Sequence, residues 1–164
     1  MSKHILSVLV ENKAGVLSKV VGLFSRRGFN IDSLAVGTTD DLGRSRITII
    51  ANGDEYLLEQ LTKQLNKLID IIKVKNLKDD EVVCRELALI KVLGLDTKSR
   101  QEIIQISNIF RSKIIDVAKT SLTIEITGTT DKIDALYDMV EPYGRIEMVR
   151  TGMIAIERGA QTIN

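Results

Sequence analysis

The chain has 164 residues, 44% hydrophobic and 27% charged, with a formal net charge of +1, the composition of an ordinary globular protein. The near-zero charge argues against a nucleic-acid partner held by a basic face, and the longest apolar run, the four residues from Leu87 to Ile90, is too short to span a membrane. One His and one Cys exclude a His/Cys metal cage, His4 is expected in a mobile tip, and the lone Cys84 fits the reducing cytoplasm.

The first half of the chain has apolar periodicities that predict the order βαββαβ. Residues 15–27 are expected to form a helix with one apolar face, which Gly28 ends. Asp54 is expected to cap the second helix. The expected strands are residues 4–10, 29–37, 44–51 and 70–77.

The second half repeats this pattern. Its strands are expected at residues 82–95, 113–119, 121–127 and about 145–157. One helix is expected from Thr97, and another begins at Thr129 or Thr130 and ends near Pro142. An ungapped offset of 75 residues superimposes the apolar positions from Ile47 to Val74 on those from Leu122 to Val149. A structural repeat explains this match better than coincidence.

The polar stretch from Asn76 to Glu81 is the natural linker, which gives domains at residues 1–77 and 82–164. Two βαββαβ units predict an α+β protein made of two ferredoxin-like domains, each with helices on one sheet face. The other face would be bare, and pairing with a second copy is the usual way to cover such a face. We therefore expect a homo-oligomer.

The turn between the first strand and the first helix has the features of a binding loop. Gly15 lets a ligand approach the backbone, and the amides that follow are the unpaired donors of a helix start, which suit a carboxylate. Asn12 adds an amide, and a second amide, Asn30, follows the helix. One chain cannot easily bring these two turns together, but two chains packed antiparallel can, around a small zwitterion. The bare pattern also fits a simple capped turn.

Five segments together resemble the ACT domain and, more closely, the family of small regulatory subunits of acetolactate synthase, also called acetohydroxyacid synthase. They are Ile5 to Leu17, Phe24 to Leu34, Leu65 to Asp70, Arg85 to Val92 and Phe110 to Val117. They extend over both halves, so the resemblance is to the whole subunit and is more specific than the common Asn-x-x-Gly loop.

The resemblance implies a subunit with no catalytic activity of its own. Its partner would be the large subunit that makes 2-acetolactate, the first common step to valine, leucine and isoleucine, and thiamine diphosphate, Mg and FAD would be bound only by that partner. The small subunit would raise the activity of the large subunit and confer feedback inhibition, usually by valine. The effector would lie between the N-terminal ACT domains of a homodimer.

The same resemblance implies which residues hold the effector. The loop would face it from one protomer and the start of the second strand from the other, a set that comprises Asn12, Lys13, Ala14, Gly15, Val16, Leu17, Asn30 and Ile31. Backbone amides would hold the carboxylate, the two asparagines the ammonium, and the apolar side chains the branched chain. The counterpart in the second half, Leu95 to Arg100, has no glycine, so that half is expected to serve assembly.

Two other classes of function are open. A stand-alone amino-acid sensor or transcription factor would need a helix-turn-helix, and no basic helical pair is apparent. An acid/base isomerase would need carboxylates in a cleft, whereas Asp40–Asp41 and Asp79–Glu81 fall in an expected turn and linker. Arg44 and Arg46 alternate with the core face of their strand and are expected to face solvent.

Overall fold

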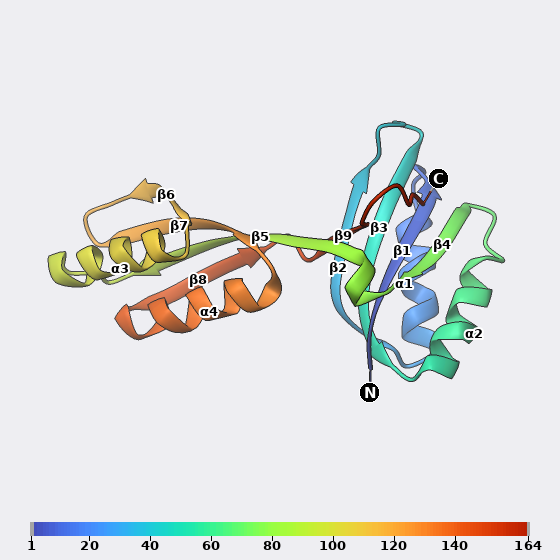
Figure 1. The fold of residues 1–164 in the computed structure, drawn as a ribbon, viewed down its shortest axis with the longest axis horizontal. Coiled ribbons are helices and arrows are strands. Elements are labelled where there is room, and N and C mark those ends of the chain that lie inside the picture. The colour runs from blue at the N-terminus through green and yellow to red at the C-terminus, as the bar shows by residue number, and fades with distance from the viewer. Residues whose placement is uncertain (1, 164) are drawn as a thin grey trace. The chain divides into compact units, whose positions relative to one another are not determined.

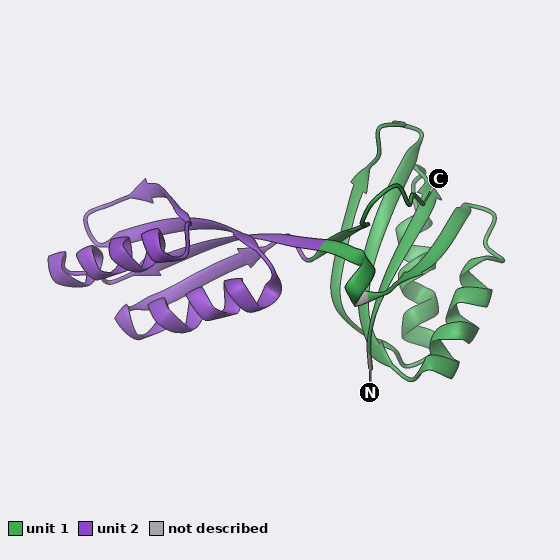
Figure 2. Cartoon of the chain, in the orientation of Figure 1, with its two compact units in different colours: residues 1–83, 153–164 green, residues 84–152 purple. Residues whose placement is uncertain are grey.

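The computed structural model describes residues 2–163 and divides into two compact units (Figure 2). Unit 1 comprises Met1–Val83 together with Met153–Asn164, and unit 2 comprises Cys84–Gly152. The expected second domain, residues 82–164, therefore differs from the structure, because its C-terminal segment folds with the first unit. Among the described residues, no helix is long and apolar enough to cross a membrane.

Unit 1 contains an antiparallel sheet with the strand order β2-β3-β1-β4 and two helices on one face (Figure 1). Its elements are β1 (Ser2–Glu11), α1 (Val16–Arg26), β2 (Asn30–Thr38), β3 (Arg44–Gly53), α2 (Glu55–Leu65), β4 (Ile71–Leu77) and the 3-10 turn η1 (Asp79–Glu81), with β9 (Ile154–Glu157) from the far end of the chain. Strand β9 pairs with β5 (Val82–Leu93).

Unit 2 repeats the arrangement with the order β6-β7-β5-β8. After β5 come α3 (Thr97–Ile109), β6 (Lys113–Val117), β7 (Ser121–Gly128), α4 (Thr130–Val140), the 3-10 turn η2 (Glu141–Tyr143) and β8 (Arg145–Arg150). The two sheets have equivalent strand orders when β1 to β4 are matched with β5 to β8. The predicted α+β class, with two ferredoxin-like βαββαβ units, is thereby confirmed.

Local sequence signals set several helix ends. The Asp54 carboxylate accepts a hydrogen bond from the Leu57 amide at 3.0 Å, which satisfies a donor at the start of α2. Gly28 has φ +71°, a left-handed conformation that favours glycine just after a helix. Helix α4 ends at Val140, two residues before Pro142. His4 is half-buried in β1, opposite Ala51 on β3, so its prediction as part of a mobile tip is wrong.

The core of each unit lies between its sheet and its helices. In unit 1 it joins inward residues of β1 and β3 to the apolar stripes of α1 and α2, among them Leu6, Val8, Ile49, Phe24 and Leu61. The alternation along β1 sends Leu6 and Val8 to this core and Ile5, Ser7 and Leu9 to the opposite face. We call that opposite face of the unit 1 sheet the open face.

The open face is buried by the protein's own C-terminal segment, residues 153–163, which we call the strap (Figure 1). The open-face residues Ile5, Ser7 and Leu9 are at most 2% exposed, and Met153 and Ala155 of the strap are also buried. The hydrophobic pattern predicts a last strand of the second domain at about 145–157, which includes residues 153–157 of the strap. Because the strap covers the open face, unit 1 has no bare sheet face that a second copy of the chain would need to cover.

Arg46 contributes to this closure, so the prediction that it faces solvent is wrong, whereas Arg44 is exposed as predicted. Its Nε donates to the Ser7 hydroxyl at 2.8 Å and its Nη2 to the Ala155 carbonyl at 3.1 Å. Burial lowers the pKa of Arg46, and the nearby charge of Glu157 opposes that effect.

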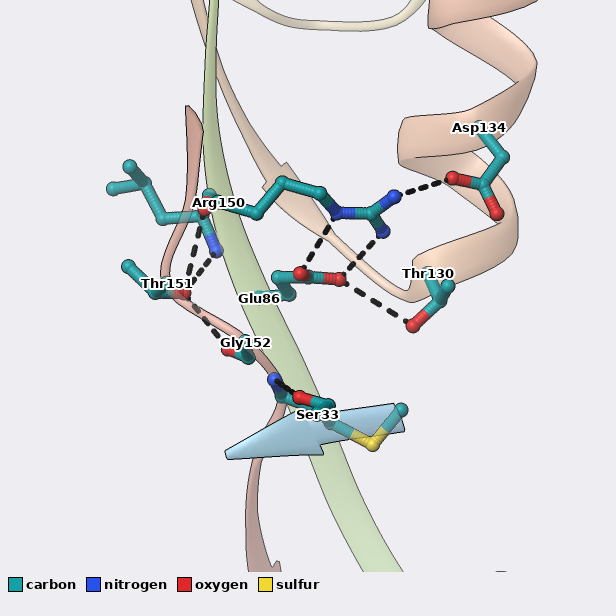
Figure 3. A network of polar contacts seen from close by, with 9 residues as sticks. Ser33, Glu86, Thr130, Asp134, Arg150, Thr151 and Gly152 are labelled. Atoms are coloured by element: carbon teal, nitrogen blue, oxygen red, sulfur yellow. Dashed lines mark hydrogen bonds and ion pairs between the residues drawn. The ribbon is translucent and has the colours of Figure 1, made fainter. Parts of the chain in front are cut away.

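Unit 2 contains a polar network of its own around Glu86, a buried carboxylate on β5 (Figure 3). Arg150 on β8 donates to it from Nε at 2.8 Å and from Nη2 at 2.7 Å, and its Nη1 donates to Asp134 on α4 at 2.7 Å. These hydrogen bonds raise the pKa of Arg150. The network joins two strands to a helix.

Candidate functional site

The loop before α1, residues 12–17, has the geometry of an anion-binding site. Gly15 occupies the N-cap position with φ +83° and provides no side-chain cap. A β-carbon at this position would have no heavy atom within 4 Å, so open space lies beside the backbone. Since the first amides of a helix have no partner within it, they can donate to a carboxylate there.

Asn12 fixes the shape of the loop. Its backbone amide donates to the Gly43 carbonyl at 2.8 Å, and its side-chain Nδ2 donates to the Leu42 carbonyl at 2.9 Å. Both acceptors belong to the hairpin between β2 and β3, so Asn12 ties the loop to that hairpin. The Asn12 side chain thus holds the loop to the hairpin and does not cap α1, and its side-chain carbonyl is the atom suited to accept from an ammonium.

The remaining loop residues differ in what they offer. Lys13 and Ala14 are exposed, and Leu17 is 39% exposed. Val16 is only 3% exposed and packs in the core of unit 1, so its side chain does not fit the predicted role of lining a branched ligand. The Val16 backbone amide donates to the Lys13 carbonyl at 3.4 Å, a long hydrogen bond that a ligand bound to this amide would replace.

A lysine–aspartate pair lies beside the loop. Lys19 Nζ is 2.7 Å from Asp70 Oδ2, and the Glu11 amide donates to the Asp70 carbonyl. The hydrogen bond from Lys19 is the main cause that lowers the pKa of Asp70. Because Lys19 is engaged in this way, the backbone amides are the groups best placed to bind an anion.

The start of β2 forms a second polar group. Asn30 Nδ2 donates to Asp32 Oδ1 at 2.8 Å, and Asn52 on β3 donates to the other carboxylate oxygen of Asp32. Ile31 is half-buried and packs against the core. Asp32 and Asn52 were absent from the sequence prediction. Alternation along a strand could have indicated Asp32, two residues from Asn30, but Asn52 required the pairing of β2 with β3.

The two polar groups lie at opposite ends of the unit 1 sheet. The binding loop adjoins the end where Glu11 pairs with Arg44, whereas Asn30 pairs with Asn52 near the other end. The 11-residue helix α1 separates them by about 16 Å. The prediction that one chain does not bring Asn12 and Asn30 together is confirmed.

Unit 2 has no equivalent of this anion-binding site. Asp96 is the N-cap of α3, and its carboxylate accepts from the Ser99 amide at 2.7 Å. This hydrogen bond lowers the pKa of Asp96. A carboxylate of the protein itself therefore takes the place that an anionic ligand would need.

The two acidic clusters lie in a hairpin and a turn, and each borders a surface pocket: Asp40 borders one beside the strap, and Asp80 and Glu81 border one with Glu157 and Arg158. Asp41 lies in the β2–β3 hairpin, where its Oδ1 accepts from the Gly43 amide at 2.9 Å and its Oδ2 pairs with Arg44. Asp80 and Glu81 belong to the turn η1. Within residues 2–163, no group of three or more His, Cys, Asp and Glu side chains is placed to hold a metal ion.

Known proteins resemble the chain over nearly its whole length. The probable acetolactate synthase small subunit of Methanothermobacter thermautotrophicus is 51% identical over 98% of this chain and 95% of its own. The acetolactate synthase small subunit of Haemophilus influenzae is 49% identical over 98% of this chain and 99% of its own. The crystal structure of the small subunit from Thermotoga maritima, 42% identical, matches 98% of this chain and 100% of its own with a TM-score of 0.90.

Two family profiles match separate parts of the chain. The profile described as AHAS small subunit-like ACT domain matches residues 6–73, which include the loop, α1 and β2. The profile described as small subunit of acetolactate synthase matches residues 85–159. Together with the relatives, they place both halves in one family. The chain belongs to the family of acetolactate synthase small subunits, the regulatory partners of a catalytic large subunit.

Proposed function

We propose that this chain activates the thiamine-diphosphate-dependent large subunit of acetolactate synthase and makes it sensitive to feedback inhibition by valine. The chain itself catalyses no reaction and holds none of the cofactors, which belong to the large subunit. It works in the cytoplasm as a homodimer with two valine sites. Family membership supports the regulatory role, and the geometry of unit 1 supports the position of the site.

The observation that carries the proposal is the position of β2 at an edge of its sheet. The outer side of an edge strand presents unpaired backbone groups, ready to pair with another strand. If β2 pairs antiparallel with β2 of a second copy, the Asn30 end of one strand meets the hairpin end of the other. Asn12 is bonded to that hairpin, so the two polar groups meet across the dimer.

Each group then has a role suited to a zwitterion. The amides after Gly15 receive the carboxylate. The ammonium is bound by the side-chain carbonyl of Asn12 from one protomer and by Asn30 and Asp32 from the other. Carboxylate and amide oxygens suit this role because they accept hydrogen bonds. Leu17 and Ile31 contact the branched side chain. Such a site spans two chains, so valine stabilises one arrangement of the dimer, and coupling of this kind is typically worth about 1–3 kcal/mol.

The test compares wild-type protein with Gly15→Asp. A carboxylate at Gly15 repels that of valine, and aspartate tolerates a left-handed backbone better than most residues, so the variant should fold. A matched control is Gln101→Asp, which adds the same charge at an exposed position on α3. Valine affinity is measured by calorimetry, and activity is measured after reconstitution with the large subunit.

We expect the wild type and Gln101→Asp to bind valine with equal affinity. Gly15→Asp should bind valine at least tenfold more weakly. In the reconstituted enzyme, valine should inhibit the wild type and the control but not Gly15→Asp. Equal affinity for all three proteins would exclude the site. Failure of the wild type to activate the large subunit would exclude the function.

A further inference from the structure

The strap contacts three strands of the sheet that carries the proposed effector site. The Met153 amide donates to the Ser33 hydroxyl on β2 at 2.9 Å (Figure 3), and the Ala155 carbonyl accepts from Arg46 on β3. Lys75 Nζ on β4 lies 2.6 Å from Glu157 Oε2. The strap is therefore fastened to the sheet at both edges and at one inner strand.

Of these contacts, the one to β2 lies closest in sequence to the proposed site. Ser33 follows Asn30 and Ile31, and the pairing of β2 with β3 shifts register between Ile31 and Ser33. Such a bulge changes which face a strand presents. It allows Ile31 and Leu34 to pack against the core, while Ser33 between them contacts the strap on the open face.

Strand β2 is also irregular at the point where it contacts the strap. Within its own unit β2 has one strand neighbour, β3, and in the proposed dimer it also pairs with β2 of the second copy, while its register with β3 shifts at the bulge. Besides this pairing and the packing of Ile31 and Leu34 against the core, the contact of Ser33 holds β2 to the strap. A ligand that pulls on Asn30 and Ile31 therefore acts directly on that contact.

The strap in turn has room to respond. A pocket of about 320 Å³, partly open to solvent, lies between the strap and the sheet, lined by Leu9, Thr38, Arg46, Ile156, Glu157 and Ile163 among others. The strap is therefore not close-packed against the sheet at this point, which leaves space for it to shift. The chain enters the strap at Met153 directly from Gly152, the last residue of unit 2.

We propose that the strap, residues 153–163, transmits effector binding on β2 to unit 2 through the Ser33–Met153 and Arg46–Ala155 hydrogen bonds. The proposal rests on the proposed function, because it takes valine as the effector. Binding displaces the start of β2, the Ser33 contact moves with it, and the strap passes the displacement to the chain that enters unit 2. Ser33 and Arg46 are positioning residues in this scheme, since neither belongs to the proposed binding site.

The experiment uses the full chain reconstituted with the large subunit. Ser33→Ala removes the acceptor for the Met153 amide, and Arg46→Met removes the donor to Ala155 but keeps an aliphatic stem. The matched controls lie on α2: Thr62→Ala removes a hydroxyl that bonds to the Leu58 carbonyl, and Lys63→Met removes one exposed positive charge. Three quantities are measured: calorimetric affinity for valine, activity without valine and maximal inhibition by saturating valine.

We expect Ser33→Ala and Arg46→Met to bind valine within threefold of the wild type and to activate the enzyme normally, while maximal inhibition falls by at least half. Both controls should behave as wild type. Unchanged inhibition in both strap variants would overturn the proposal. Loss of valine binding by these variants would also overturn it, because the contacts would then belong to the binding site.

A second readout separates transmission from a merely structural role. Hydrogen exchange of backbone amides in the strap should change when valine binds the wild type, and this change should shrink in Ser33→Ala. If valine inhibits the enzyme but does not change hydrogen exchange in the strap, transmission through the strap is refuted. If wild-type protein neither binds valine nor responds to it, the proposed function fails, a result distinct from either outcome above.

Discussion

The ion pair of Glu86 and Arg150 gives a sharp test of how unit 2 is held together. We predict that Arg150→Met destabilises the protein, because it leaves the Glu86 carboxylate buried without its cation. The side chain of Glu86 is 6% exposed and that of Arg150 is 28% exposed. Methionine retains most of the apolar stem of arginine, so the lost charge dominates the effect.

The magnitude follows from the contacts. Removing one partner of a buried ion pair costs about 3–5 kcal/mol. Arg150 is partly exposed, and the Thr130 hydroxyl still lies 3.4 Å from Glu86 Oε2, so water and this hydroxyl compensate in part. We therefore expect the lower end, a loss of about 3 kcal/mol in the free energy of unfolding.

The assay is urea unfolding followed by circular dichroism. Lys91→Met is the matched control, since it breaks a pair of 3.6 Å whose side chains are 42% and 73% exposed, and we expect it to cost less than about 1 kcal/mol. The double variant Glu86→Gln/Arg150→Met removes the unpaired charge of Glu86. Its free energy of unfolding should be higher than that of Arg150→Met by about 1 kcal/mol or more. A double variant no more stable than Arg150→Met would refute the reasoning, as would a single variant no less stable than Lys91→Met.

Three further predictions concern unit 1. Asp54→Ala removes the cap of α2 and should lower the free energy of unfolding by about 1 kcal/mol in urea, whereas an unchanged midpoint would contradict the capping role. Phe24→Ala empties a fully buried position in the core and should cost about 3–5 kcal/mol by the same assay, against little effect for the exposed Tyr56→Ala. Lys19→Met should raise the pKa of Asp70, read from its carboxyl resonance in an NMR titration. Since the folded pKa of Asp70 lies below its unfolded value, the Lys19 pair stabilises at neutral pH. That advantage over Lys19→Met should vanish as the pH falls below the folded pKa, and a constant difference down to that pH would contradict it.

The proposed site was predictable in part. Asn12 and Gly15 stand out because a glycine before a helix and an amide three residues earlier are local features of the sequence. Asp32 and Asn52 were missed because their meeting depends on pairing between β2 and β3. The ligand-lining role of Val16 came from the family resemblance; periodicity places Val16 on the apolar face of its helix, and the structure buries it there in the core.

The sequence by itself determined the elements and their repetition. Apolar alternation, helical periodicity and the caps at Asp54 and Gly28 act over a few residues, so they could be read without a structure. The repeat of the βαββαβ pattern predicted the α+β class and the two ferredoxin-like units.

Only the tertiary structure decided where the chain's end lies. By its pattern the start of the strap, residues 153–157, continues the last strand. Yet the Met153 amide donates a hydrogen bond to Ser33 and the Ala155 carbonyl accepts one from Arg46, partners more than 100 residues away in sequence. Contacts of such separation leave no periodic trace, because they depend on which faces remain exposed after the sheet has formed. For the same reason Arg46 appeared to face solvent, although it packs beneath the strap that covers the open face.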